Sequence, residues 1–79
     1  MLISPAQCRA ARALIGWSQG QLAEAAKVAP ATIATWERGK RTPYDRTLLD
    51  IQAALQAAGV VFVADGETST GGEGVRIVK

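Results

Sequence analysis

The sequence contains no histidine, and Cys8 is its only cysteine. A 79-residue chain of this kind has no internal disulfide and lacks the usual ligands of a transition-metal site. It also has no phosphate-binding glycine loop and no serine or cysteine nucleophile with an evident base. We therefore expect no enzymatic activity, no cofactor and no metal. A single free thiol is typical of the reducing cytoplasm.

Aromatic residues are few and long apolar runs are absent. The chain has two Trp, one Tyr and one Phe, so its core has to be built mainly from Ala, Leu, Ile and Val. The longest apolar run, residues 57–64, is interrupted by Gly59 and is far shorter than the roughly 20 residues of a membrane-spanning helix. These features predict one small soluble domain in the cytoplasm, with no membrane partner and with a core that association would help to complete.

The charge is small in total but uneven along the chain. The formal net charge is +2, whereas Arg38, Lys40, Arg41 and Arg46 lie close together in the sequence. Such a cluster favours an anionic partner. A solvated basic turn without a partner has the same pattern, so the charge alone does not decide between them.

Helix boundaries are marked by serine, proline and glycine. Ser4 and Ser18 are each followed three residues later by glutamine, which is the pattern of a capping box. Pro5 and Pro30 suit a first helical position, and Gly16 suits the left-handed residue that ends a helix. Together with the apolar periodicity, these signals predict helices over residues 5–15, 19–26, 30–38 and 45–58.

The C-terminal segment changes to strand-like patterning. Residues 60–64 and 75–78 are β-branched runs, separated by a loop rich in Gly, Ser, Thr and acidic residues. They predict a β-hairpin. The expected fold is therefore mainly α, with a compact four-helix domain over residues 1–59 followed by a hairpin over residues 60–79.

The second and third predicted helices are joined by a turn of three residues. The third helix opens with small residues and is followed by the basic cluster, an arrangement that fits the major groove of DNA. Around them the chain resembles the Cro and repressor type of helix-turn-helix protein, also called the xenobiotic-response-element (XRE) family. The resemblance covers about residues 6–59 and is carried by Arg12, Gly16-Trp17-Ser18-Gln19, Leu22-Ala23, Val28, Thr32-Ile33, Trp36-Glu37 and Gly39-Lys40-Arg41-Thr42-Pro43.

The resemblance implies a sequence-specific regulator of transcription, a repressor, that binds double-stranded DNA. It implies that Ser18 and Gln19 lie at the phosphate backbone, where Gln19 also props against the third helix. It further implies two groups of contacts on and after the third helix: base edges facing Pro30, Ala31, Thr32 and Thr35, and phosphates facing Arg38, Lys40, Arg41 and Tyr44.

Two departures from the family pattern bear on specificity. Lys27 stands in the turn where the family usually has glycine, so a left-handed backbone there would cost about 1 kcal/mol. Ala29, Pro30 and Ala31 replace the amide and hydroxyl side chains that often face the bases. We therefore expect sparse hydrogen bonding to bases, with thymine methyl contacts or DNA shape carrying more of the specificity.

Arg12 falls on the inward face of the first helix, where a charge is costly unless it is paired. The family resemblance implies a salt bridge to Glu37 in the third helix. The alternatives are that Arg12 reaches water or pairs with Glu24.

The hairpin has apolar residues on both faces of its first strand and an open strand edge. A second copy pairing there would give a homodimer, which would match a near-palindromic operator. The expected dimer contacts are Val61, Phe62, Val63, Val75 and Ile77. Alternatively, the hairpin only completes the core of one subunit. A different function on the same fold is a protein interaction module or an antitoxin-like protein that binds a protein partner.

Overall fold

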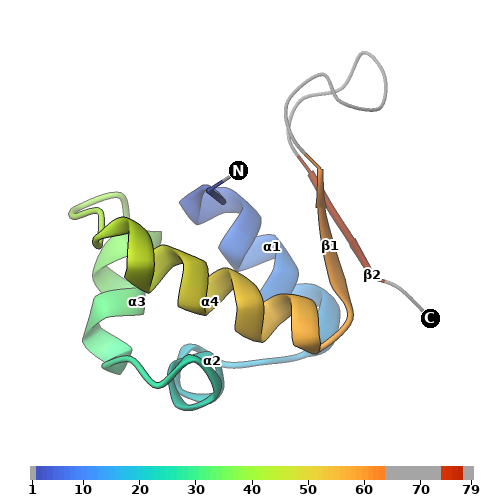
Figure 1. Cartoon of the computed structure of the whole chain (residues 1–79), viewed down its shortest axis with the longest axis horizontal. Coiled ribbons are helices and arrows are strands. Elements are labelled where there is room, and N and C mark those ends of the chain that lie inside the picture. Colours follow the sequence, from blue (N-terminus) through green and yellow to red (C-terminus); the bar gives the residue numbers. More distant parts are fainter. Residues whose placement is uncertain (1, 64–73, 78–79) are drawn as a thin grey trace.

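The computed structural model describes residues 2–63 and 74–77, and within them the chain forms four helices and a two-stranded antiparallel sheet (Figure 1). The helices are α1 (Pro5–Ile15), α2 (Gln19–Ala26), α3 (Pro30–Glu37) and α4 (Asp45–Ala57). The strands are β1 (Val60–Val63) and β2 (Gly74–Ile77). This confirms the predicted mainly α fold with a C-terminal hairpin. The predicted strand residues Ala64 and Val78 and the loop between the strands lie outside the described residues.

Both predicted capping boxes are present. The Ser4 hydroxyl accepts from the backbone N–H of Gln7 at 3.1 Å, and the Gln7 side chain accepts from the Ser4 N–H at 2.9 Å. Ser18 and Gln21 repeat this exchange at 3.1 and 2.8 Å. Each box satisfies N–H groups that have no partner inside the helix, which fixes where α1 and α2 begin.

The turn between α2 and α3 has the left-handed residue expected at Lys27, with φ of 60°. Lys27 ends α2 by donating its backbone N–H to the Glu24 carbonyl at 3.3 Å. The predicted ends of α3 and α4 are each one residue too long, because Arg38 and Ala58 are the capping residues. The turn therefore has the predicted length of three residues, although Lys27 adopts a left-handed backbone that is strained for a non-glycine residue.

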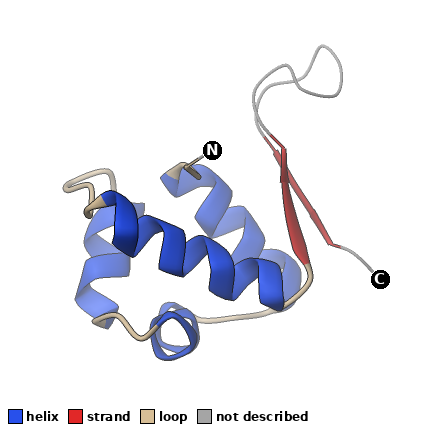
Figure 2. Cartoon of the chain, in the orientation of Figure 1, coloured by secondary structure: helices blue, strands red, loops and turns tan. Residues whose placement is uncertain are grey.

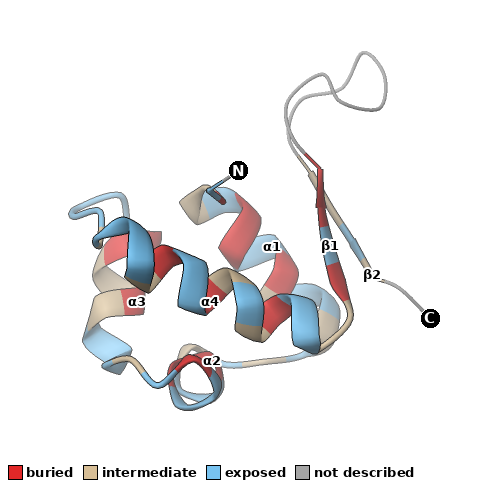
Figure 3. Cartoon of the chain, viewed as in Figure 1, coloured by how far each residue is buried: buried red, intermediate tan, exposed pale blue. Residues whose placement is uncertain are grey.

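The helices surround one apolar core to which the hairpin also contributes. The short α2 packs against both α3 and α4, whereas α1 contacts α3, α4 and both strands, as the ribbon shows (Figure 2). Buried residues lie on the sides of the helices that face one another, and the outward side of α4 is largely exposed (Figure 3). The core consists of Ile3, Cys8, Ala11, Leu22, Ala23, Ala26, Ile33, Trp36, Leu48, Ile51, Leu55, Val60 and Phe62.

Gln7 attaches the hairpin to α1. Its amide donates to the backbone carbonyls of Val63, at 3.0 Å, and of Gly74, at 3.1 Å, which are opposite each other in the strand register. One side chain thus caps the start of α1 and holds both strands at the end of the hairpin. The sequence identified only the first of these roles.

This attachment determines which hairpin side chains are accessible. Phe62 and Val63 are each 8% exposed, and Val75 packs against the core. These three side chains are therefore largely covered by other residues of the same chain. Ile77 is half-buried, and Val61 is 39% exposed. Of the five predicted dimer residues, Val61 is therefore the most accessible to a partner. No helix in residues 2–63 and 74–77 has the length and apolar character needed to cross a membrane.

Candidate nucleic-acid interface

The outward face of α3 carries small side chains. Pro30 and Ala31 are exposed and Thr32 and Thr35 are half-buried, whereas Ile33 and Trp36 point into the core. Trp36 is 2% exposed and belongs to the core, so its ring is not available to stack on a nucleic-acid base. Because the inward residues anchor α3, its outward face is a rigid surface open to a partner.

A groove of about 630 Å³ runs between this face and the segment that leads into α4. We call it the α3 groove. It brings together three predicted base-facing residues and two predicted phosphate-facing residues with several that the sequence did not single out for contact. Its lining residues are Val28, Ala31, Thr32, Thr35, Arg41, Thr42, Pro43, Tyr44 and Thr47. Thr47 was not predicted, because its position depends on how α4 packs after the loop.

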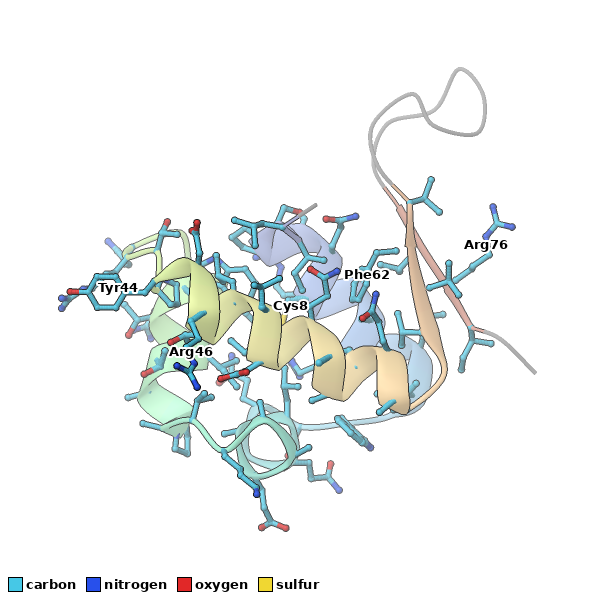
Figure 4. The ribbon with its side chains drawn as sticks, in the orientation of Figure 1. Cys8, Tyr44, Arg46, Phe62 and Arg76 are labelled. Atoms are coloured by element: carbon cyan, nitrogen blue, oxygen red, sulfur yellow. The ribbon has the colours of Figure 1, made fainter. Side chains whose placement is uncertain are left out.

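Arg41 lines this groove, and it is solvent-exposed together with Arg38 and Lys40 of the same α3–α4 segment. Arg38, Lys40 and Arg41 follow the end of α3, and Gly39 lets the chain turn there with φ of 74°. Tyr44 is 85% exposed and points away from the body of the molecule (Figure 4). Arg76 points outward from the hairpin at the opposite side of the same view. The small side chains of α3 and the positively charged Arg41 therefore line the same groove.

Glu37 is the centre of a buried polar cluster beneath α3. Its carboxylate accepts from Arg12 twice, with Nε to Oε2 at 2.8 Å and Nη2 to Oε1 at 2.6 Å. It also accepts from the Gln19 amide and the Cys8 thiol, each at 3.0 Å. The ion pair is the one expected between Arg12 and Glu37, and neither Glu24 nor open water replaces it. We call Cys8, Arg12, Gln19 and Glu37 the Glu37 cluster.

The cluster shifts the ionisation of its members. Burial would raise the pKa of Glu37, but hydrogen bonds from Arg12, Gln19 and Cys8 outweigh it and hold that pKa below its ordinary value. The hydrogen bond to Glu37 raises the pKa of Arg12 further above its ordinary value. Burial, with the hydrogen bond to Glu37, raises the pKa of the Cys8 thiol. At neutral pH the cluster is thus an ionised pair with a neutral thiol.

Two further contacts tie α3 to its neighbours. Gln19 in α2 donates its side-chain amide to Glu37, which lies at the C-terminal end of α3. Arg9 in α1 donates to the backbone carbonyl of Glu37. α3 has no basic residue in its own last turn, and Arg9 supplies a cation to this carbonyl end. Sequence patterns did not identify Arg9, since nothing local links residues 28 positions apart.

Two short helices, held at a three-residue turn and followed by an exposed basic segment, define the helix-turn-helix class of DNA-binding protein. Comparison with known families agrees, because the helix-turn-helix family model matches residues 9–58, well over half of the chain. The chain belongs to this family, in its Cro and repressor (XRE) type. No curated protein matches the chain. Within residues 2–63 and 74–77, no group of three or more Cys, Asp and Glu residues is placed to hold a metal ion.

Proposed function

We propose that this chain is a sequence-specific regulator of transcription, a repressor, that inserts α3 into the major groove of double-stranded DNA in the cytoplasm. The observation that carries the proposal is the α3 groove, where the predicted base-facing residues Ala31, Thr32 and Thr35 lie beside the exposed Arg41. Such a surface offers the positioning and base contacts that a DNA-binding site requires.

The proposed contacts divide by position on the surface. Pro30, Ala31, Thr32 and Thr35 face base edges. The remaining contacts reach phosphates and set the position of the helix, and they are Ser18, Gln19, Arg38, Lys40, Arg41 and Tyr44. Cationic side chains release counterions when they bind phosphates, so the affinity depends on salt concentration.

The proposal further includes a homodimer. Within the described residues β1 and β2 pair only with each other, so each strand has one edge that pairs with no further strand, and Val61 of β1 is exposed. A second copy added at such an edge would present two copies of α3 about a two-fold axis. The matching operator is a near-palindrome with half-sites roughly 34 Å apart. In this proposal residues 60–79 are the dimerisation element of the protein.

Selection of bound fragments from a pool of genomic duplex DNA tests the function. We expect enrichment of one near-palindromic sequence, and weaker binding to it as salt is raised. Arg41→Ala should reduce the slope of log affinity against log salt by about 0.9 for each phosphate that Arg41 neutralises. Arg76→Gln removes an exposed cation far from α3 and should leave this slope unchanged, once its oligomeric state is checked.

Failure to enrich any sequence, together with an affinity that does not change with salt, would exclude DNA as the main partner. That result would favour the role of a protein interaction module on the same fold.

A further inference from the structure

The outward face of α3 is short of hydrogen-bonding side chains. Pro30 and Ala31 have no side-chain donor or acceptor, and Thr32 and Thr35 add one hydroxyl each. A hydroxyl can both donate and accept, so it binds several base edges and separates the four base pairs poorly. A sequence preference at this face therefore requires a different chemistry.

The α3 groove supplies that chemistry, because small apolar groups gather in it. Val28 and Pro43 contribute side chains from outside α3, and Ala31 contributes its methyl from within it. Thr32 and Thr35 add methyl groups next to their hydroxyls. In the major groove, thymine is the base that presents a methyl group.

The size of these side chains matches a close approach. No side chain at positions 28, 31, 32 or 35 is larger than valine, so the α3 backbone can lie near the base edges and the groove stays open. Longer side chains such as glutamine or arginine would fill this space and bind base edges by hydrogen bonds instead.

Building on the proposed function, we propose that the α3 groove recognises thymine methyl groups, so that T·A base pairs in each half-site are selected by apolar contact. Arg38, Lys40 and Arg41 then contribute affinity that is independent of base identity.

Replacing thymine by deoxyuridine tests this inference, because the replacement removes only the C5 methyl. On the duplex enriched by genomic selection, each half-site thymine is replaced singly and the dissociation constant is measured. We expect binding to weaken by about fourfold for each methyl that the groove contacts. Replacements outside the half-sites are the control and should not change binding.

Matched variants identify the protein side of the contact. Thr35→Ser removes the methyl and keeps the hydroxyl, so it should abolish the deoxyuridine effect at one thymine. Thr35→Val keeps a methyl and removes the hydroxyl, so it should retain that effect whatever its overall affinity. The same pair of variants at Thr32 tests the neighbouring position.

The outcomes separate the two proposals. An enriched sequence that tolerates deoxyuridine at every half-site thymine overturns methyl recognition and leaves DNA binding intact. A deoxyuridine effect that is unchanged in both Thr35→Ser and Thr32→Ser overturns the assignment of the contact to the threonine methyl groups of the groove. The absence of any enriched sequence overturns the proposed function, and methyl recognition with it.

Discussion

Glu37 shows how much of this small protein depends on a single buried carboxylate. Its side chain is 2% exposed and accepts hydrogen bonds from α1 and from α2, while its own backbone belongs to α3. Arg12 also donates to the carbonyl of Trp17 at 3.0 Å, which extends the same contacts to the segment before α2. Because a buried charge is costly when it loses a partner, removal of a group that pairs with Glu37 should destabilise the fold.

The first prediction concerns Glu37→Gln. At neutral pH the substitution should lower the free energy of unfolding by about 3 kcal/mol, because Arg12 would keep a poorly compensated charge. The pKa of Glu37 is lowered on folding, so its stabilising effect is complete above the ordinary value of 4.5 and is lost as pH falls through the folded value. Urea unfolding of the wild type and the variant should therefore converge in acid. A constant difference at all pH values would contradict the assigned ionisation.

At the scale of single elements, the turn between α2 and α3 contains a strain that other sequences with this fold could avoid. Lys27 has φ of 60° and is exposed, so its side chain contributes little that would offset the left-handed backbone. Lys27 keeps this conformation because the turn is held at both ends, by the C-terminal cap of α2 and by the packing of α3 on the core.

The second prediction is that Lys27→Gly stabilises the protein by up to about 0.5 kcal/mol, because relief of about 1 kcal/mol of strain exceeds the added entropy of the unfolded chain. Gly16→Ala is the converse control and should destabilise the protein by a similar amount, up to about 0.5 kcal/mol. Gly16 has φ of 71° and open space where a Cβ would lie, so that cost comes from the backbone alone. Thermal unfolding of the two variants measures both effects, and a loss of stability in Lys27→Gly would contradict the argument.

The third prediction separates the two roles of Gln7. Gln7→Met removes the side-chain hydrogen bond of one capping box and both hydrogen bonds to the hairpin, whereas Gln21→Met removes only the equivalent side-chain hydrogen bond at the start of α2. Gln7→Met should therefore cost about 1 to 2 kcal/mol more. Hydrogen exchange should also become faster in β1 and β2. Equal losses in the two variants would show that the contact with the hairpin adds no stability.

At the scale of the whole molecule, the hairpin belongs to the same core as the helices. Val60 and Phe62 lie in the buried cluster, while Val61, between them, faces outward. Alternation along a strand explains the difference, because neighbouring side chains point to opposite faces. Phe62 is consequently a poor probe of dimerisation, since changing it would disturb the interior of the monomer.

The fourth prediction uses that alternation. Val61→Asp should shift the proposed dimer toward monomer and weaken operator binding, while the midpoint of thermal unfolding at low protein concentration stays nearly unchanged. Phe62→Asp should instead unfold the chain, because an unpaired charge would enter the core. Light scattering with circular dichroism measures both. A wild-type chain that is folded and monomeric at micromolar concentration would contradict the dimer and favour a hairpin that only completes the core.

Features that depend on neighbouring residues were determined by the sequence alone. Ser4 and Ser18 start their helices, Gly16 ends α1, and apolar spacing predicted the four helices, because capping and periodicity act over a few residues. The family resemblance added the Arg12 and Glu37 pair.

Contacts between distant residues were decided only by the tertiary structure. Gln7 meets the hairpin across 56 and 67 residues, and Arg9 and Cys8 reach Glu37 across 28 and 29. The tertiary structure also decides that Phe62, and not Val61, is buried in the core. A period of two defines two faces of a strand, but only packing against α1 and α4 selects which face is buried.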